Sequence, residues 1–303
     1  MAKKVITKNT NIIIGEVFNV KITPFKSNKG AIVNLGVRDR LHNNIIYVNL
    51  TDYGRGIRYN GNDYTPQALK NIFLDENEKS RNILVKAIAE FEENKYTNKN
   101  GIECVSARYN VRKIDTFTNS EKQNITFTYK GYVKGYKETD DNIKIRLALP
   151  KVDRDMNMSG VNSVTVEATD PEVIESISPM DIEKGCIISV KGYILNTVEY
   201  DEFGDKIKDD KYNSIAKIDE VIEADEDGVE EFVEQLKKAN KLETGMLLTS
   251  DGEIVNAKEY YASHKPTNDN KPNEVSVEEK PKTEEKPKET PIIEDDDLGE
   301  LDF

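Results

Sequence analysis

Basic and aromatic side chains alternate along a β-rich stretch in the middle of the chain, and this pattern is suited to a polyanion. In TYKGYVKGYKE, Lys130, Tyr132, Lys134 and Tyr136 stand at every second position. Successive side chains of a β-strand point to opposite faces, so these four are expected to share one face. Cations attract phosphates and aromatic rings stack on bases. The pattern therefore predicts binding of a single nucleic-acid strand.

A similar surface is predicted nearer the start of the chain. In GAIVNLGVRDR, Val33, Leu35 and Val37 share one face and are expected to point into a core, which leaves Arg38 and Arg40 outside. With the other strands and one turn, the DNA-binding set expected in this region is Lys21, Arg38, Arg40, Tyr47, Lys95, Tyr96, Lys99, Arg108 and Arg112. In the second half, Lys144 and Arg146 of IKIRLAL are expected to extend the stripe of Lys130, Tyr132, Lys134 and Tyr136.

Each of these residues also has an ordinary explanation. Lys, Arg and single Tyr side chains are common on any solvated strand. The binding hypothesis rests on their recurrence on the same side of strands that are expected to be neighbours.

No catalytic constellation is evident. The sequence has only two histidines, His42 and His264, and two cysteines, Cys104 and Cys186, without the spacing of a metal site. The phosphate-binding patterns GxGxxG and GxxxxGK[ST] and the zinc pattern HExxH are absent. We therefore expect no catalytic residues, no metal and no cofactor, and we predict that the protein is not an enzyme.

Charge is distributed unevenly along the 303 residues, whose net charge is −13. Residues 1–125 hold 20 Lys and Arg against 13 Asp and Glu, whereas residues 126–222 hold 13 against 19. The last stretch, 265–303, holds 6 against 13. A basic front and an acidic end indicate a polyanion partner and an acidic tail.

The elements that would position these residues follow the same order twice. The first half reads as strands at 12–25, 30–40 and 44–50, a helix from Thr65 and Pro66, and a strand pair at 81–93 and 101–117. The second half reads as strands at 125–138, 140–150 and 161–168, a helix at 170–179, and strands at 185–200 and 211–224. This is the strand order of an OB-fold, a small barrel that binds oligonucleotides. Two short matches, VKAI at 85 with VKGY at 190 and KID at 113 with KID at 217, also suggest a repeat.

The fold predicted is mainly β, with two tandem OB-fold barrels followed by a short α-helical segment and a disordered acidic C-terminal tail. From Lys265 the sequence is rich in Pro, Glu, Lys and Thr and cannot bury enough apolar surface to fold. The expected domains are 1–122 (basic, DNA-binding), 123–224 (second barrel), 225–264 (helix and small hairpin of unassigned role) and 265–303 (linker and acidic tip).

The last residues, IIEDDDLGELDF, carry six acidic side chains, no basic one and a terminal aromatic. With the predicted barrels, this tip resembles single-stranded DNA-binding proteins of the bacterial and phage type, which join an OB-fold core to an acidic tip whose final Phe docks into partners. The resemblance implies a tip made of Asp295, Asp296, Asp297, Leu301, Asp302 and Phe303. Asp302 stands where the bacterial tip has Pro, so the tip is more similar to the phage versions.

The resemblance implies a protein that binds and protects single-stranded DNA without strong sequence specificity. It also implies roles in replication, recombination or repair, with replication or recombination proteins recruited by the tip. With two barrels in one chain, the protein can act as a monomer. The sequence has no signal peptide and no run of about 20 apolar residues, so a cytoplasmic location is expected, in the host cell if a phage encodes it. The alternatives are an OB-fold scaffold or assembly protein making protein contacts, and an RNA-binding protein.

Overall fold

The structure is a computed structural model. It describes residues 8–27, 29–42, 44–97, 101–139, 141–153, 157–180, 182–197, 213–223 and 229–263. Two compact units are present, Met1–Ala257 and Lys258–Phe303, and both barrels lie in the first. Lys99 and every residue of the expected tip lie outside the described residues. Of the helices in the described ranges, none is long and apolar enough to cross a membrane.

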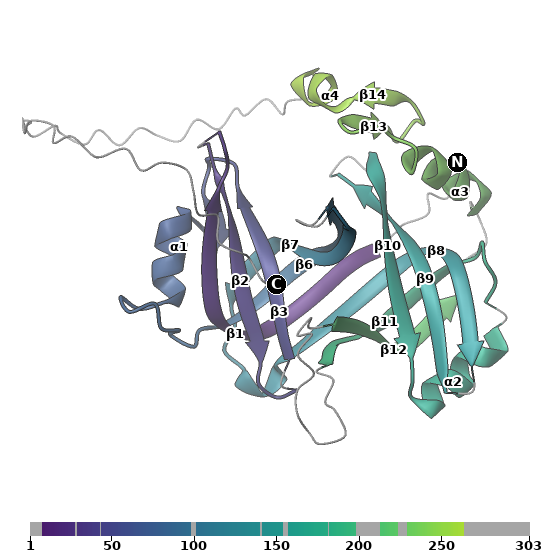
Figure 1. The fold of residues 1–303 in the computed structure, drawn as a ribbon, viewed down its shortest axis with the longest axis horizontal. Coiled ribbons are helices and arrows are strands. Elements are labelled where there is room, and N and C mark those ends of the chain that lie inside the picture. The colour runs from purple at the N-terminus through teal and green to yellow at the C-terminus, as the bar shows by residue number, and fades with distance from the viewer. Residues whose placement is uncertain are drawn as a thin grey trace, which may run out of the picture. The chain divides into compact units, whose positions relative to one another are not determined.

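The first barrel has the topology of an OB-fold (Figure 1). Its elements are β1 (Lys8–Pro24), β2 (Ala31–Asp39), β3 (Asn44–Asp52), α1 (Pro66–Phe73), β6 (Leu84–Thr97) and β7 (Glu103–Thr116). β1, β2 and β3 form an antiparallel meander, and β6 pairs antiparallel with both β1 and β7. The parallel pairing of β3 with β7 closes the barrel.

The second barrel repeats this topology. Its elements are β8 (Asn124–Thr139), β9 (Asn142–Val152), β10 (Met158–Ala168), α2 (Pro171–Ile177), β11 (Ile187–Thr197) and β12 (Asn213–Glu223). β8, β9 and β10 form the meander, β11 pairs with β8 and β12, and β10 closes the barrel by a parallel pairing with β12. The prediction of two tandem OB-fold barrels is confirmed.

The repeat extends to the β-bulges. The register of β1 with β2 shifts between Val17 and Asn19, and that of β8 with β9 shifts between Val133 and Gly135. A second bulge recurs in the same way. Its extra residue is Arg112 of β7, opposite Ile88 and Ala89 of β6, and Asp219 of β12, opposite Lys191 and Gly192 of β11. Bulges re-aim the side chains around them, so residues at matching register positions can be compared directly between the barrels.

The matching registers show that the two short sequence matches were coincidental. Val85 pairs with Gly15 and Ile188 with Gly131, so Val85 corresponds to Ile188 and not to Val190. In the same way, Lys113 and Glu220 each directly follow the extra residue of the bulge on their own strand. Lys113 therefore corresponds to Glu220, and the two KID triplets are not equivalent. The evidence for the repeat in the sequence was therefore the order and spacing of the strands, not these short matches.

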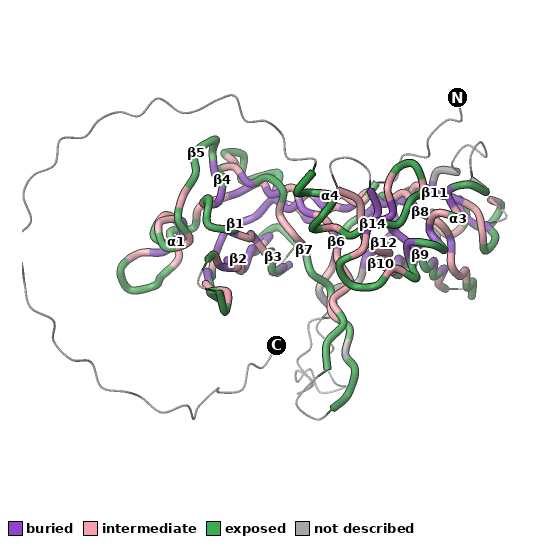
Figure 2. The backbone as a smooth tube through the Cα atoms, turned by 90° about the horizontal axis from the view of Figure 1, so that it is seen from above, coloured by how far each residue is buried: buried purple, intermediate pink, exposed green. Residues whose placement is uncertain are grey.

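Strand alternation supplies the core of each barrel as expected. Val33, Leu35 and Val37 in the first barrel are fully buried, as are Ile143 and Ile145 in the second. Figure 2 shows buried backbone along the strands of both barrels and exposed backbone at their connections. Removing these side chains from water is the main force that holds such a barrel together.

Helix α1 begins where the sequence predicts, but it ends earlier. The Thr65 hydroxyl accepts a hydrogen bond from the Ala68 N–H at 3.2 Å, and Pro66 opens the helix. The helix stops at Phe73, which is buried under the barrel. The stretch before it, expected to be irregular, holds a small hairpin, β4 (Ile57–Tyr59) and β5 (Asn62–Tyr64). Its turn residues, Asn60 and Gly61, have φ of 49° and 80°, which is the Asn-Gly hairpin turn.

The two barrels are joined through one continuous sheet. β1 pairs antiparallel with β8 from Lys8 opposite Lys130 to Ile14 opposite Asn124, and Asn11 opposite Phe127 is the midpoint. Two buried asparagines at matching positions of β3 and β10 tie each barrel to the other. Asn44 Nδ2 donates to the Ile194 carbonyl at 2.9 Å, and Asn162 Nδ2 donates to the Phe91 carbonyl at 3.2 Å. The barrels therefore face each other as a pseudo-symmetric pair within one chain.

A helix and a hairpin follow the second barrel, as expected. They are α3 (Val229–Ala239), β13 (Met246–Leu248) and β14 (Ile254–Asn256), and α4 (Ala257–Ser263) begins at the end of the first unit. On α3, Phe232 and Leu236 are buried in a second apolar cluster that includes Ala148 and Ile187 of the barrel. The helix thus covers part of the outer surface of the second barrel.

Candidate nucleic-acid interface

The outward face of β1, β2 and β3 is an open surface on the first barrel. Register places Asn19, Gly36 and Tyr47 in one row across the three strands. Tyr47 is 46% exposed. The next row contains Lys21, Asn34 and Asn49, in which Asn34 Nδ2 donates to Asn49 Oδ1 at 2.9 Å. The predicted outward positions of Lys21, Arg38 and Tyr47 are confirmed.

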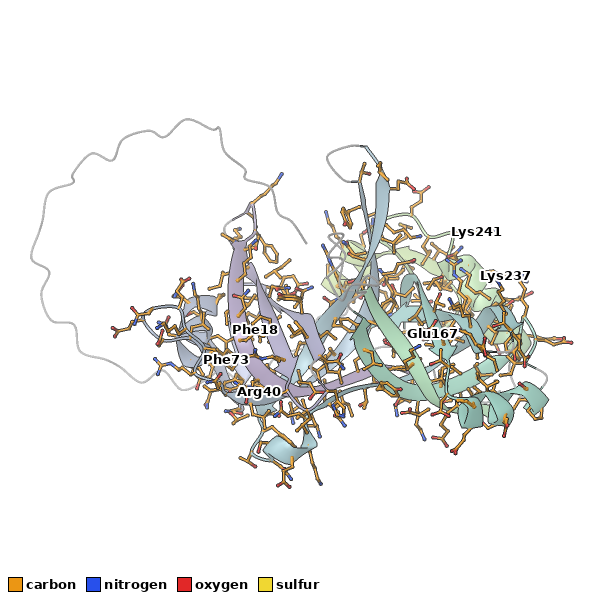
Figure 3. The ribbon with its side chains drawn as sticks, turned by 60° about the horizontal axis from the view of Figure 1, so that its bottom comes forward. Phe18, Arg40, Phe73, Glu167, Lys237 and Lys241 are labelled. Carbon is orange, nitrogen blue, oxygen red and sulfur yellow. The ribbon has the colours of Figure 1, made fainter. Side chains whose placement is uncertain are left out.

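Phe18, which the alternation did not identify, forms the centre of this face. It sits in the bulge of β1, and its ring lies edge-on to Tyr47 with the centroids 6.0 Å apart. The guanidinium carbon of Arg38 lies 5.7 Å from the Phe18 centroid. A Cβ on Gly36 would come within 2.7 Å of the ring, so glycine leaves room for Phe18 to lie across β2. Figure 3 labels Phe18 on the first barrel.

A second aromatic pair lies at the other end of the same face. Phe25 follows β1 and Tyr53 follows β3, and their ring centroids are 6.0 Å apart. Tyr53 is 78% exposed. Asp52 Oδ1 fixes the backbone after it by accepting from the N–H groups of Gly54 at 2.7 Å and of Arg55 and Gly56 at 2.9 Å. At the usual strand rise, Tyr47 and Tyr53 are roughly 20 Å apart along β3.

We call this surface the platform. It consists of Phe18, Lys21, Phe25, Arg38, Tyr47 and Tyr53. Among the described residues, neither Lys21 nor Arg38 has an ion-pair partner; Lys21 is exposed and Arg38 is half-buried, with its Nε buried. Arg108 borders the platform, because Val48 pairs with Tyr109 and thereby sets Arg108 beside Tyr47.

Two of the predicted cations, Arg40 and Arg112, are not part of the platform and form ion pairs with glutamates. Arg40, labelled in Figure 3, lies 2.6 Å from a Glu16 carboxylate oxygen and donates to Asn82 at 3.1 Å. Arg112 forms an ion pair with Glu90 at 2.5 Å and lies near the Val152 carbonyl of the second barrel. Sequence alone could not show these partners, because they come from distant strands.

Of the predicted turn residues, Lys95 and Tyr96 lie near the end of β6 in the β6–β7 hairpin. Lys95 and Tyr96 are exposed, and Lys95 stands 3.7 Å from Glu93. The same hairpin exposes Ile102 by 59% and Val105 by 63%. Their contact with a ligand stays a prediction.

The stripe expected on β8 is wrong at Tyr136, because the bulge between Val133 and Gly135 breaks the alternation before this residue. Tyr136 lies opposite buried Ile145 and therefore points inward, and its hydroxyl donates to Glu138 at 2.8 Å. Burial, with the Glu138 hydrogen bond and charge, raises the pKa of Tyr136 to about 12. Tyr132 instead packs in the cluster under α3. Lys130, Tyr132 and Lys134 keep the predicted alternation, but the aromatic among them is covered by α3.

The cations predicted on β8 and β9 lie in different environments. Lys130 lies opposite Lys8 in the sheet that joins the barrels. Lys134 occupies the bulge and donates to Ser163 at 3.3 Å. Lys144 and Arg146 are exposed on β9, as predicted.

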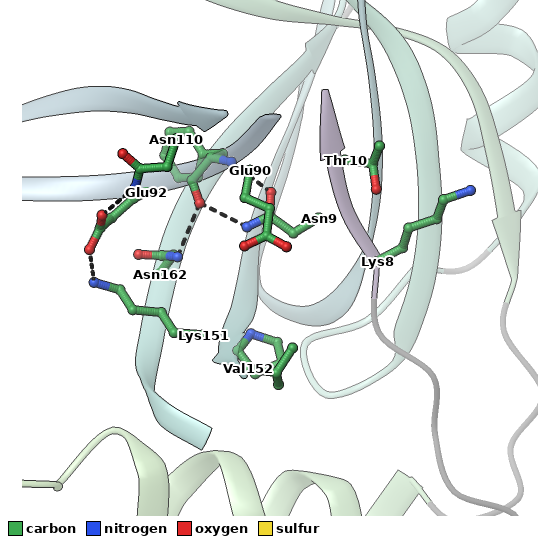
Figure 4. Close-up of a pocket in the computed structure, with 11 residues that line it drawn as sticks. Lys8, Asn9, Thr10, Glu90, Glu92, Asn110, Lys151, Val152 and Asn162 are labelled. Atoms are coloured by element: carbon green, nitrogen blue, oxygen red, sulfur yellow. Dashed lines mark hydrogen bonds and ion pairs between the residues drawn. The ribbon is translucent and has the colours of Figure 1, made fainter. Parts of the chain in front are cut away.

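A polar pocket of about 300 Å³ lies at the junction of the barrels (Figure 4). Its lining comprises Lys8, Asn9, Thr10, Glu90, Phe91, Glu92, Asn110, Pro150, Lys151, Val152 and Asn162. Glu92 accepts from Lys151 Nζ and from Asn110 Nδ2, both at 2.6 Å. Burial alone would raise the pKa of Glu92, but these bonds and the nearby charges of Lys151 and Arg108 outweigh it and lower the pKa. The Lys151–Glu92 ion pair and the Asn162–Phe91 hydrogen bond link the barrels at this pocket. Within the described part of the chain, no group of His, Cys, Asp or Glu side chains could hold a metal ion.

Comparisons with known proteins find similar solved structures but no match in sequence. No family model matches the sequence, and no curated protein does. Among solved structures, the wild-type single-stranded DNA-binding protein from Thermus aquaticus aligns with a TM-score of 0.45 and 14% identity over 73% of this chain and 95% of that one. A deletion mutant of that protein gives a TM-score of 0.45 and 16% identity over 73% of this chain and 96% of its own. The assignment of OB-fold barrels to this chain rests on its strand pairings.

Proposed function

We propose that the protein binds single-stranded DNA without strong sequence specificity. The observation that carries the proposal is the platform, where two aromatic pairs and two cations lie on the open face of an OB-fold barrel. Every base has a π-face, so aromatic plates bind single strands with little regard to sequence. Lys21 and Arg38 would neutralise phosphates between the stacked bases.

This surface favours a single strand over a duplex. In a duplex the base faces are stacked on each other and are not open to Tyr47 or Tyr53, whereas a single strand can offer them. Binding would cover the bases and protect the strand. Replication, recombination and repair are the processes that expose such strands, and we propose that the protein serves one of them, in a phage or its host.

The test is a fluorescence-anisotropy titration of labelled oligo-dT at two salt concentrations, with the matching duplex and an oligo-U strand as competitors. We expect tight binding that weakens steeply with salt, because bound cations are released from the strand. The duplex should compete poorly. Absence of binding at low salt would refute the proposal, and stronger competition by oligo-U would make RNA the ligand.

A second candidate function is a scaffold that makes protein contacts. The exposed Ile102 and Val105 on the β6–β7 hairpin favour it, because apolar side chains at a protruding tip can dock into a partner. The titration separates the two candidates, since only the nucleic-acid binder loses affinity for oligo-dT as salt rises.

The acidic C-terminal tail would bind protein partners and regulate DNA binding. We propose that the tip of Asp295, Asp296, Asp297, Leu301, Asp302 and Phe303 recruits replication or recombination proteins, as its charge and terminal aromatic suit a basic-rimmed apolar pocket. The acidic tail can also compete with DNA for the basic barrel. We propose further that the chain acts as a monomer. The edge of β1 with which a second copy could pair is occupied by β8 of the same chain.

A further inference from the structure

The matching registers allow the platform to be compared with its counterpart on the second barrel, residue by residue. Asn19, Gly36 and Tyr47 form one row in the first barrel, and Gly135, Arg146 and Thr165 form the matching row in the second. In the next row, Lys21 and Asn34 are matched by Lys137 and Lys144. Phe18, in the first bulge, is matched by Lys134.

The comparison shows that aromatic side chains of the first barrel are replaced by charged ones in the second. None of the matching positions in these rows carries an aromatic residue, and the position of Gly36, which leaves room for a ring, is filled by Arg146. Asn49 is matched by Glu167, but this carboxylate is held by Lys217 at 2.5 Å and Lys144 at 3.6 Å. Burial opposes ionisation of Glu167, yet the Lys217 hydrogen bond and charge outweigh it and lower its pKa.

Helix α3 removes a further part of this surface. Arg38, which lies over Phe18 in the first barrel, is matched by Ala148. Ala148 is 4% exposed and packs in the cluster with Phe232 and Leu236 of α3. The cations exposed on this face are Lys137, Lys144 and Arg146, of which Lys144 also lies 3.6 Å from Glu167.

We infer that the barrels divide the contacts with single-stranded DNA, the first stacking bases and the second holding phosphates alone through Lys137, Lys144 and Arg146. The inference rests on the proposed function, because it assigns the roles of two surfaces on the same ligand. The second barrel is then a site for the sugar–phosphate backbone, indifferent to the presence of bases.

The experiment compares three double variants of the full chain. Phe18→Ala with Tyr47→Ala removes stacking, and Lys144→Gln with Arg146→Gln removes phosphate contacts. Lys79→Gln with Lys122→Gln is the charge-matched control, since both lysines are exposed and lie off the two faces. Each is titrated over a salt series with an oligo-dT of about 32 nucleotides, enough for two OB-folds at their larger site size. The second probe is an abasic strand of equal length.

The stacking variant should lose between about 5- and 150-fold in affinity for oligo-dT for each stacked base lost. Its affinity for the abasic strand and its salt slope should stay unchanged. The phosphate variant should lose affinity for both strands by the same factor. Its salt slope should fall by about 1.4, at about 0.7 for each phosphate on a single strand.

Two results would overturn the inference. One is a phosphate variant that binds both probes like the control, and the other is one that loses affinity for oligo-dT but not for the abasic strand. Failure of the proposed function looks different, because the unaltered protein would then bind neither probe.

Discussion

At the scale of single residues, the platform depends on where a bulge places one ring. Arg38 and Tyr47 were predictable because strict alternation holds on β2 and β3, and Lys21 because it holds on β1 beyond the bulge. Phe18 was not, because the bulge in β1 turns a side chain out of the sequence pattern. The same device in β8 explains why Tyr136 points inward rather than outward. A glycine inside a strand, here Gly36, was the available signal that a ring lies above it.

Replacing Tyr47 tests the stacking surface. We expect Tyr47→Ala to weaken oligo-dT binding by about 1–3 kcal/mol, the usual worth of one base on one ring. Tyr47→Phe should bind almost normally, since it keeps the ring. Tyr193→Ala is the control, because Tyr193 is an exposed tyrosine on the second barrel. Anisotropy titration measures all three, and equal affinity of the Ala and Phe variants at position 47 would remove stacking from the account.

Gly36→Ala tests how Phe18 is seated. The added Cβ would meet the far end of the Phe18 ring at 2.7 Å, and the ring can swing toward solvent to avoid it. We therefore expect weaker binding of oligo-dT with little change in the melting temperature. A variant that binds like the unaltered protein would show that the ring position is unimportant.

At the scale of elements, strand order and spacing were readable from the sequence, and every strand of both barrels was anticipated within a few residues. The β4–β5 hairpin was missed although its Asn60-Gly61 turn is a known hairpin signal. The ion pairs of Arg40 and Arg112 could not be anticipated, since they depend on which strands the fold brings together. The amphipathic α3 was expected, but the surface that it covers was not.

Leu236→Ala tests the docking of α3 on the second barrel. Leu236 is 5% exposed, and removing such a side chain costs about 2–5 kcal/mol. We expect faster hydrogen exchange in α3 and unchanged exchange in the first barrel. Glu234→Ala, an exposed site on the same helix, is the control. If hydrogen exchange became faster to the same extent in both barrels, α3 would not unfold independently of them, which would contradict the prediction.

At the scale of the whole molecule, the two barrels behave as a pseudo-symmetric pair built into one chain. The paired edges of β1 and β8, the reciprocal bonds of Asn44 and Asn162, and the Glu92–Lys151 ion pair hold them together. Sequence analysis anticipated the repeat but not this junction, because single polar residues give no hint of a partner in another domain.

Acid should weaken this junction. Glu92 has a pKa below its usual 4.5, so its ionised form is favoured by folding. Its stabilising contribution is complete above the unfolded pKa and is lost as the pH falls through the lower folded pKa. We expect Glu92→Gln to reduce stability at neutral pH and to make the acid-induced loss of stability shallower. Urea titrations at several pH values measure this, and identical slopes for both proteins would contradict it.

Deleting residues 293–303 tests the proposed competition by the tail. These residues are strongly acidic and residues 1–125 are basic, so removal should tighten oligo-dT binding at low salt and have less effect at high salt, where the charges are screened. A deletion that leaves affinity unchanged at low salt would refute the competition. Replacing the acidic residues of the segment with Asn and Gln separates charge from length.

The most direct test of the platform is one titration of oligo-dT against a quadruple variant, Phe18→Ala, Phe25→Ala, Tyr47→Ala and Tyr53→Ala, beside the unaltered protein. Circular dichroism confirms that both are folded. We predict that the variant loses most of its affinity for oligo-dT while a duplex remains a poor ligand for either protein. Unchanged affinity in the folded variant would contradict the assignment of DNA binding to this face.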